Sequence, residues 1–274
     1  MSEGGSLRLV KYEGAGNDFL VLIDPDGEQS VGDAEVRNLC DRRRGVGADG
    51  FIQVVRGTDG ADLIMELRNA DGGRAETSGN GLRCVAQAAV ETGLASPPRF
   101  VVRTADQLIQ VEYQQGGAAG SAQATVQFPP VRLLGSFSDG PTGFHVYRAD
   151  TGNPHLVVIC EDPADMDVGT IGPNLALASP TGANVEFVAR GPGVGELTMR
   201  VWERGAGETW ACGSGSCAAA AVARSLGMVG DRVLVRNPGG TLEVVFGAGD
   251  EDPVYLSGPM RRVADVIVDR NVIA

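Results

Sequence analysis

Two glycine-rich turns that match each other across the halves of the chain constrain its fold more than any other feature. The first is Ser78-Gly79-Asn80-Gly81 and the second is Cys212-Gly213-Ser214-Gly215. The landmarks before the turns keep matching distances: Asn17 lies 61 and Asn69 nine positions before Ser78, and Asn153 lies 59 and Glu203 nine positions before Cys212. Matched spacing at three landmarks indicates an internal repeat, which predicts two related lobes in the 274-residue chain.

Each turn lies between a strand pattern and a helix pattern. Residues 62–68 and 197–202 alternate apolar and polar side chains, which is typical of strands. Continuing the alternation places Asn69 and Glu203 on the apolar faces, where a polar group needs a partner or a ligand. Residues 82–90 and 217–223 have almost no polar face, which indicates buried helices. Further strand-like segments are residues 19–23, 99–103, 108–113, 124–128, 156–159, 185–188, 232–235 and 242–246.

These patterns predict an α/β (α+β) fold of two pseudo-symmetric lobes. Each lobe is expected to be a mostly antiparallel sheet wrapped around a central buried helix. Residues 1–130 would form the N-terminal lobe, to which residues 262–274 can return, and residues 131–261 the C-terminal lobe, with the active site in the cleft between them. The pair Pro129-Pro130 and the polar, glycine-bearing stretch 135–143 are the expected junction.

Charge and hydropathy exclude several classes of partner. The chain has 23 basic and 35 acidic side chains, a net charge of −12, which repels nucleic acid and anionic membrane surfaces. No stretch approaches the roughly 18 apolar residues of a membrane span, and the N-terminus has no signal-peptide pattern. We therefore expect a soluble, cytoplasmic protein that binds a small molecule.

The composition also argues against the common cofactors. The chain has two histidines, His145 and His155, without metal-ligand spacing, and one lysine, Lys11, near the N-terminus. A histidine-based metal site and a pyridoxal phosphate Schiff base are therefore poor expectations. The glycine-rich turns lack the signatures of dinucleotide or P-loop binding. Five widely spread cysteines suggest neither a disulfide framework nor a zinc site.

The position of the two turns suggests what they do chemically. A turn that opens a helix presents unpaired backbone N–H groups and positive potential, to which a carboxylate can bind. The same field is expected to lower the pKa of Cys212 and favour its thiolate. Taken singly, Ser78 is more often a helix cap and Cys212 a core residue. His155 fits a turn residue and a proton carrier equally well, and Glu203 could pair with an arginine, although its inward strand position favours a site role. The repeat favours a site role for Ser78 and Cys212 together.

Six short motifs, spread almost end to end along the chain, form a specific combination. They are residues 14–19 (GAGNDF), 69–72 (NADG), 78–84 (SGNGLRC), 152–155 (GNPH), 203–209 (ERGAGET) and 211–215 (ACGSG). This combination resembles the diaminopimelate epimerase family. The resemblance implies a cofactor-independent homodimer that closes its lobes over the substrate and interconverts LL- and meso-diaminopimelate, in the bacterial lysine and cell-wall pathway.

The resemblance also implies roles for individual residues. Cys212 and the residue at position 78 would be the two acid/base groups, with His155 and Glu203 supporting them. The guanidinium of Arg204 suits a substrate carboxylate, to which it can make two parallel hydrogen bonds. The substrate-binding residues implied in this way are Asn17, Asn69, Gly79, Asn80, Asn153, Asn184, Glu203, Arg204, Gly213 and Ser214.

The chain departs from the family pattern at two positions. The family has cysteine where this chain has Ser78, and often glutamine where it has Gly50. A hydroxyl is a far poorer base than a thiol, so full activity is in question, and a substrate contact at Gly50 would be lost. Two alternatives stay open: a related cofactor-independent racemase or isomerase acting on another amino acid, and a catalytically silent amino-acid-binding homologue.

Overall fold

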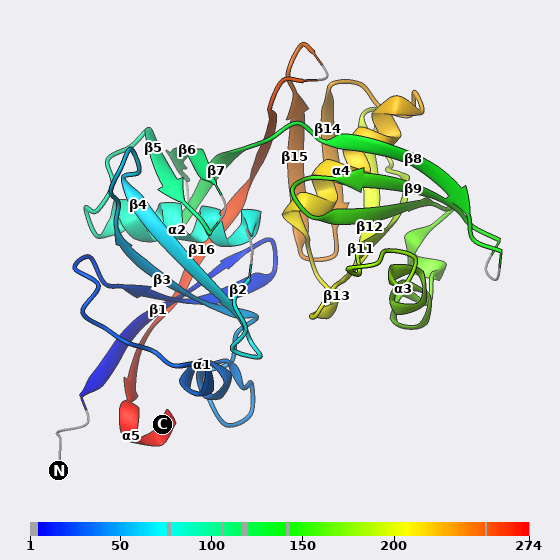
Figure 1. Cartoon of the computed structure of the whole chain (residues 1–274). Helices are drawn as coiled ribbons and strands as arrows, with labels where there is room; N and C mark the ends of the chain where they lie inside the picture. The colour runs from blue at the N-terminus through cyan, green and yellow to red at the C-terminus, as the bar shows by residue number, and fades with distance from the viewer. Residues whose placement is uncertain are drawn as a thin grey trace. The chain divides into compact units, whose positions relative to one another are not determined.

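The chain divides into two compact units in a computed structural model that describes residues 5–75, 78–105, 107–116, 120–140, 143–249 and 251–273. Unit 1 comprises residues 1–126 and 259–274, and unit 2 comprises residues 127–258 (Figure 1). The segment that returns to unit 1 is most of one long strand, β16 (Val254–Asp269), followed by the short helix α5 (Arg270–Ile273). Both chain ends therefore belong to the same unit.

Unit 1 is a closed, mostly antiparallel sheet with strand order β1-β2-β3-β4-β5-β6-β7-β16. Pairing of β16 with β1 closes it. Two neighbouring pairs, β2 with β3 and β4 with β5, are parallel. The other elements are β1 (Ser6–Gly14), β2 (Asn17–Ile23), α1 (Asp33–Cys40), β3 (Gly50–Arg56), β4 (Leu63–Asn69), α2 (Gly79–Glu91), β5 (Arg99–Arg103), β6 (Leu108–Gln115) and β7 (Ser121–Phe128).

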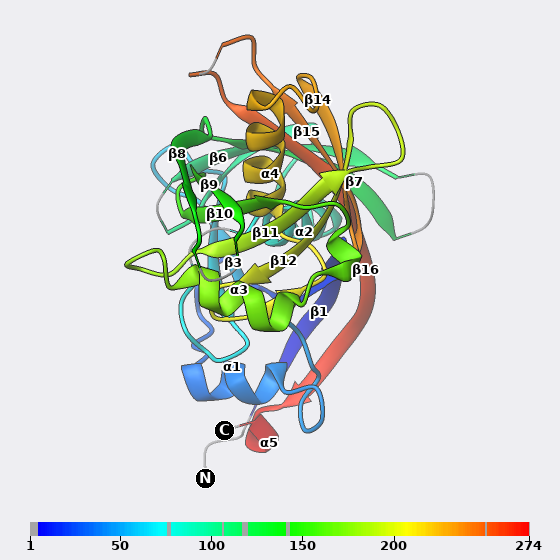
Figure 2. The ribbon, with the colours of Figure 1, turned by 90° about the vertical axis from the view of Figure 1, so that its right-hand side faces the viewer.

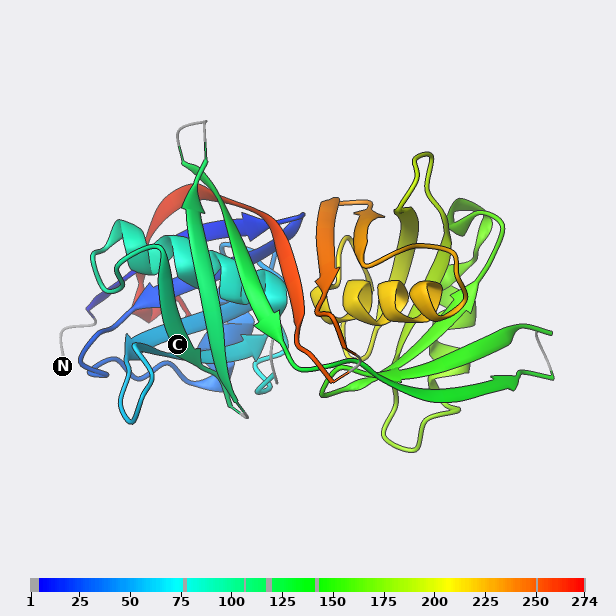
Figure 3. The same cartoon turned by 90° about the horizontal axis from the view of Figure 1, so that it is seen from above.

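Helix α2 is the centre of unit 1. Its side chains from Gly79 to Ala89 are all buried, and it packs against β1, β2, β3, β4 and β6 (Figure 3). The alanines and glycines of this helix let strands approach it closely from several directions, and its polar side chains Asn80, Arg83 and Gln87 are buried with hydrogen-bond partners. It ends at Thr92, before Gly93 in the left-handed conformation (φ 72°).

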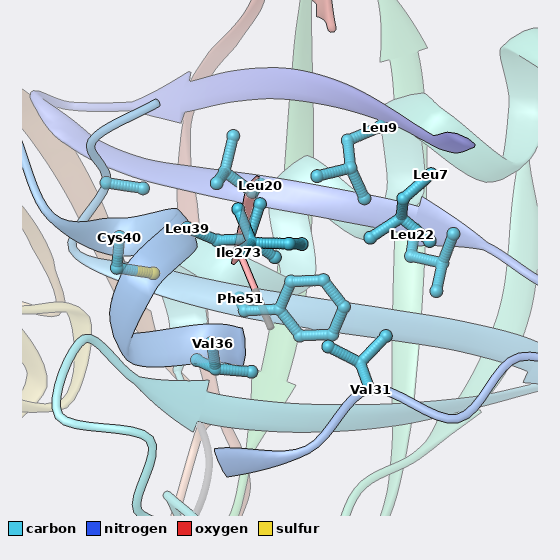
Figure 4. Close-up of a cluster of buried hydrophobic side chains, with 11 residues drawn as sticks. Leu7, Leu9, Leu20, Leu22, Val31, Val36, Leu39, Cys40, Phe51 and Ile273 are labelled. Carbon is cyan, nitrogen blue, oxygen red and sulfur yellow. The ribbon is translucent and has the colours of Figure 1, made fainter. Parts of the chain in front are cut away.

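A second layer of unit 1 covers the outer side of its sheet. Helix α1 and the C-terminal Ile273 pack against apolar side chains of the first three strands (Figure 4). Ile273 is 3% exposed and contributes to this core although it is the last but one residue of the chain. The remaining members of the cluster are Leu7, Leu9, Leu20, Leu22, Val31, Val36, Leu39, Cys40, Ala48 and Phe51.

Unit 2 repeats the strand plan of unit 1. Its order is β16-β15-β14-β12-β11-β10-β9-β8, with β13 paired to β12. Its parallel pairs, β10 with β11 and β12 with β14, occupy the places of β2/β3 and β4/β5. The elements are β8 (Arg132–Ser138), β9 (His145–Asp150), β10 (Pro154–Ile159), the 3-10 turn η1 (Pro163–Asp165), α3 (Val168–Ala176), β11 (Asn184–Arg190), β12 (Glu196–Glu203), β13 (Gly207–Thr209), α4 (Gly213–Ser225), β14 (Arg232–Asn237) and β15 (Gly240–Phe246).

Helix α4 is the counterpart of α2. It has the same length of 13 residues, and it packs against β9, β10, β11, β12, β14 and β15 (Figure 2). Its run Cys217–Ala223 is buried throughout, and the helix ends before Gly227, which has a φ of 67°. The mixed α+β fold with a mostly antiparallel sheet around a buried helix, expected from sequence, is confirmed.

One sequence expectation about the chain path was wrong. Residues 135–138 belong to the exposed edge strand β8, which pairs with β9 inside unit 2, so this part of the stretch is not a junction; residues 141 and 142 lie outside the described part. No described helix has the length and apolar character needed to cross a membrane.

Candidate functional site

Cys212 is held at the start of α4 by the turn that the sequence singled out. Its backbone is extended (φ −123°, ψ 119°), and its Sγ accepts a hydrogen bond from the N–H of Gly215 at 3.3 Å. The hydroxyl of Ser214 lies 3.5 Å from the same sulfur. The thiol is 4% exposed. The residue is therefore both a helix cap and buried, and its sulfur lies where a helix presents unpaired N–H groups.

The pKa expected for Cys212 was wrong in direction. Burial raises the pKa of the thiol well above its usual value, and the nearby carboxylates of Glu203 and Glu186 raise it further. The hydrogen bonds from Ser214 and the Gly215 N–H lower the pKa, but by less than burial raises it. Sequence reasoning counted the helix N-terminus but not the burial of the thiol or the charge of Glu203, and it did not single out Glu186.

Glu203 lies beside that thiol. It ends strand β12, on the inward face predicted from its alternation, and its carboxylate is close enough to Cys212 to raise the pKa of the thiol. Thr209, on the adjoining strand β13, donates a hydrogen bond to Glu203 Oε1. Burial raises the pKa of Glu203, and the charge of Glu186 raises it further. A carboxyl group with a raised pKa can hold a proton taken from a neighbouring thiol.

His155 is fully buried beside an acid that the sequence reading missed. Its Nδ1 lies 2.7 Å from Oε1 of Glu186, and its Nε2 lies 3.1 Å from Oδ1 of Asn153. Glu186 is 0% exposed on β11, a strand buried on nearly all its residues. One signal could have revealed it, because an acidic residue inside a continuous apolar run such as 185–189 needs a partner.

Asn184 and Arg204 lie next to each other in unit 2. The side-chain Oδ1 of Asn184 accepts a hydrogen bond from the backbone N–H of Arg204 at 2.9 Å. The exposed Arg204 guanidinium donates to the carbonyl of Thr181 through Nη1, also at 2.9 Å. Asn184 thereby fixes the backbone that follows Glu203. Of the other predicted residues of the second repeat, Cys212, Gly213 and Ser214 form the start of α4, and His155 contacts Asn153.

Ser78 in unit 1 has the same local geometry as Cys212. Its backbone dihedrals are −114° and 117°, and its Oγ accepts from the N–H of Gly81 at 3.0 Å. Gly79 and the buried Asn80 follow as the first residues of α2. The two residues before Ser78, Glu76 and Thr77, lie outside the described part of the chain. Ser78 and Cys212 are thus equivalent in backbone and cap bond and differ in side-chain chemistry.

The asparagines of unit 1 form a chain of hydrogen bonds beside this turn. Asn80 Nδ2 donates to Asn17 Oδ1 at 3.3 Å, and Asn17 Nδ2 donates to Asp49 at 2.7 Å. Arg42 in turn pairs with Asp49 at 2.7 Å. Sequence reasoning missed Asp49, which orients Asn17. Asn69, the strand-end counterpart of Glu203, pairs with Gly50 across β3 and β4.

Gly50 has a packing reason to lack a side chain. A Cβ added there would lie 2.9 Å from the carbonyl of Arg68 and 3.2 Å from the ring of Phe19. A glutamine at this position would require both strands to shift. Among the described residues, no three His, Cys, Asp or Glu side chains gather as metal ligands would.

Sequence comparison decides the family. Residues 9–128 and 147–263 match the sequence profile of the family described as diaminopimelate epimerase. The chain belongs to the diaminopimelate epimerase family. It is 41% identical to a diaminopimelate epimerase of Thermobifida fusca, over 94% of this chain and 97% of that protein. It is 38% identical to one of Desulforudis audaxviator, over 94% and 98%. The chain is therefore an isomerase of the amino-acid epimerase type.

Solved structures of proteins with other names have a fold similar to that of this chain. A PhzF-family phenazine biosynthesis protein of Bacillus anthracis matches 96% of this chain and 99% of its own, with a TM-score of 0.75 and 14% identity. A hydroxyproline epimerase of Agrobacterium vitis matches 96% and 93%, with a TM-score of 0.69 and 19% identity. At such identities the likeness concerns the fold alone.

Proposed function

We propose that this protein interconverts LL- and meso-diaminopimelate by removing and returning the α-proton, without a metal or an organic cofactor. The observation that carries the proposal is the Cys212 thiol at the start of α4, where its Sγ accepts the N–H of Gly215 and lies beside Glu203, a carboxyl group whose pKa is raised by burial. The relatives named diaminopimelate epimerase support the substrate.

The first half of the reaction uses Cys212 and Glu203. As the thiol proton moves to Glu203, the negative charge passes from the carboxylate to sulfur and the charge of the pair does not change. Burial therefore opposes this transfer less than it opposes loss of the proton to water. The thiolate then takes the α-proton, the C–H bond breaks, and the electron pair spreads into the substrate carboxylate. Unpaired N–H groups at a helix start stabilise that developing charge.

The second half of the reaction is assigned to Ser78, which would return a proton on the opposite face of the α-carbon. The equivalence of its cap geometry to that of Cys212 supports this role. A hydroxyl gives up and accepts protons less readily than a thiol, so we propose that inversion is slow relative to exchange at Cys212. The substrate would be bound by Asn17, Asn69, Gly79, Asn80, Asn153, Asn184, Glu203, Arg204, Gly213 and Ser214.

Solvent exchange tests the proposal. Each isomer of diaminopimelate is incubated with the enzyme in D₂O, and α-deuterium and configuration are measured by NMR and chiral chromatography. We expect one isomer to gain deuterium much faster than it inverts, because Cys212 acts alone on its own face. Equal rates of exchange and inversion from both isomers would contradict the proposal that Ser78 transfers protons more slowly than Cys212.

The same assay separates the alternatives. Exchange with another amino acid, such as hydroxyproline, and none with diaminopimelate would indicate a related racemase. Thermal stabilisation by diaminopimelate without any exchange would indicate a silent binding protein, an outcome that the serine at position 78 keeps open.

We also propose a homodimer, which the family resemblance implies. Three large apolar side chains on β16 and α5, those of Val263, Ile267 and Val272, stay exposed on the single chain. A second copy could cover such a surface. Light scattering coupled to size exclusion measures the mass directly, and a mass of one chain at micromolar concentration would refute the dimer.

A further inference from the structure

The pair of His155 and Glu186 is the most unusual feature of unit 2. Both side chains have no exposed surface, and 2.7 Å separates Nδ1 from Oε1. They come from the neighbouring parallel strands β10 and β11. The second oxygen of Glu186, Oε2, has no hydrogen-bond partner among the described residues. A buried carboxylate with an unpaired oxygen lowers stability, so the core alone does not explain it.

Unit 1 shows that the fold needs no charge at these positions. His155 pairs with Asn184 in the same way as Phe19 pairs with Gly50, and Glu186 and Ile52 follow two residues later. Glu186 and Ile52 also lie at equivalent places against the starts of the two helices. A Cβ on Gly215 would lie 2.6 Å from Glu186 Oε1, and a Cβ on Gly81 would lie 3.1 Å from Ile52 Cδ1. Phenylalanine and isoleucine thus occupy in unit 1 the places of histidine and glutamate in unit 2.

The pair continues to a residue proposed to bind substrate. Asn153 Oδ1 receives the hydroxyl of Thr151 at 2.9 Å as well as His155 Nε2 at 3.1 Å. A carbonyl oxygen has two lone pairs, and both are used here. The amide nitrogen of Asn153 is then the atom left to donate to a ligand.

Both ring nitrogens of His155 therefore face oxygen atoms that only accept hydrogen bonds, a carboxylate on one side and an amide carbonyl on the other. We propose that Glu186 is a positioning residue that keeps His155 doubly protonated, so that His155 fixes Asn153 with its amide nitrogen directed to a substrate carboxylate. This inference rests on the proposed function for its substrate. It makes His155 a hydrogen-bond donor and not a base in the reaction.

Other charged groups act on the same pair. The carboxylate of Glu203 interacts with both His155 and Glu186, and the Cys212 thiol is close enough for both acids to raise its pKa. On the other side, the β9 residue paired with His155 is the uncharged Ala149. The negative carboxylates favour a positive imidazolium ring, which agrees with the hydrogen-bond pattern.

Nitrogen NMR of the histidine rings tests the protonation state without any substrate. The chain has two histidines, so ¹⁵N-histidine labelling gives two rings, and His145→Gln assigns them. We expect both ring nitrogens of His155 to carry a hydrogen atom at pH 7.5, because each of them faces an oxygen that only accepts hydrogen bonds. An unprotonated His155 nitrogen at neutral pH in the wild-type enzyme would overturn the proposal.

Two sets of variants test the positioning. In Glu186→Gln we expect His155 to become neutral at pH 7.5 and KM for diaminopimelate to rise about tenfold, as for the loss of a hydrogen bond with a charged group. The matched control is Glu243→Gln, which removes an acid paired with Arg232 on β14 and β15 and should leave both readouts unchanged. Unchanged ¹⁵N signals of the His155 ring and an unchanged KM in Glu186→Gln would refute the role of Glu186 as a positioning residue.

The double variant with His155→Phe and Glu186→Ile copies the unit 1 residues into unit 2. We expect it to fold with a Tm at least equal to that of the wild type and to lose most of its substrate affinity. An unfolded double variant would mean that the pair is structural, and wild-type substrate affinity would mean that the pair does not affect binding; either result overturns the proposal.

If the enzyme does not act on diaminopimelate, the proposed function fails while the NMR result still decides the protonation of His155.

Discussion

At the residue scale, the two turns differ mainly in one atom. Ser78 and Cys212 share backbone angles and a cap bond to the N–H three residues later. An oxygen in one place and a sulfur in the other give a hydroxyl and a thiol, of which the thiol gives up its proton more readily.

We predict that Ser78→Cys raises the epimerisation rate by 10²-fold or more, the usual contribution of a competent acid/base group. The new thiol would lie at a helix start equivalent to that of Cys212. Initial rates with each isomer measure the effect, and Ser225→Cys, which adds a thiol near the end of α4, is the control. An unchanged rate would mean that Ser78 is already competent or that the reaction is another one.

We predict that Glu203→Gln raises the Tm at pH 7.5 while it abolishes epimerisation. Burial raises the pKa of Glu203 in the folded protein, so this group's contribution to stability is full below its unfolded pKa and falls as pH rises through the folded value. A glutamine at position 203 does not ionise, so the variant does not lose this stability as pH rises. The Tm difference from wild type, measured by differential scanning fluorimetry, should shrink as pH falls toward about 4.3, the unfolded pKa. A variant less stable than wild type at pH 7.5 would contradict this.

At the scale of elements, the start of α4 is packed more tightly than the start of α2. A Cβ on Gly215 would lie 2.6 Å from Glu186 Oε1 and 3.2 Å from Cys212 Sγ. At the equivalent Gly81, the nearest atom would be the flexible end of Met65, at 2.9 Å. The first contact involves a buried carboxylate whose partner is fixed, and the second a side chain that can turn away.

We therefore predict that Gly215→Ala lowers the free energy of unfolding by about 1–3 kcal/mol, the range for overpacking a core. Its kcat should fall at least tenfold, because Cys212 and Glu186 must both move. Gly81→Ala is the matched variant. It should change stability less, because the end of Met65, which is the nearest atom to the new Cβ, can turn away. Urea unfolding and initial rates measure both. Equal effects at the two glycines would show that the contact with Glu186 is unimportant.

At the scale of the whole molecule, the last residues complete the unit that the first residues begin. Residues 261–269 of β16 pair with β1, and Ile273 packs into the core beside α1. Both tryptophans, Trp202 and Trp210, belong to unit 2. Tryptophan fluorescence therefore follows unit 2, whereas far-UV circular dichroism follows both units.

We predict that truncation after Gly258 unfolds unit 1, because its sheet loses the strand that closes it. The cooperative fluorescence transition of unit 2 should persist while the circular dichroism signal falls by about half, in line with the similar sizes of the units. The milder Ile273→Ala should cost about 2–4 kcal/mol in unit 1. Native circular dichroism of the truncated chain would show that the returning strand is dispensable.

The sequence by itself determined the repeat, the two buried helices, many of the strands and the family. These features rest on local periodicity, glycine positions and spacing, which the linear order of residues records directly. Residues 261–269 were not recognised as a strand, although residues 262–274 were expected to return to the first lobe, because this part of β16 pairs with β1 while most of its side chains stay exposed.

The tertiary structure decided the chemistry of the site. The direction of the Cys212 pKa depends on burial and on Glu203 and Glu186, one nine and the other 26 positions earlier in the chain. His155 meets Glu186 because two parallel strands lie side by side, with helix α3 between them in sequence. Electrostatic energies depend on distance and on exclusion of water, and neither quantity exists until the chain has folded.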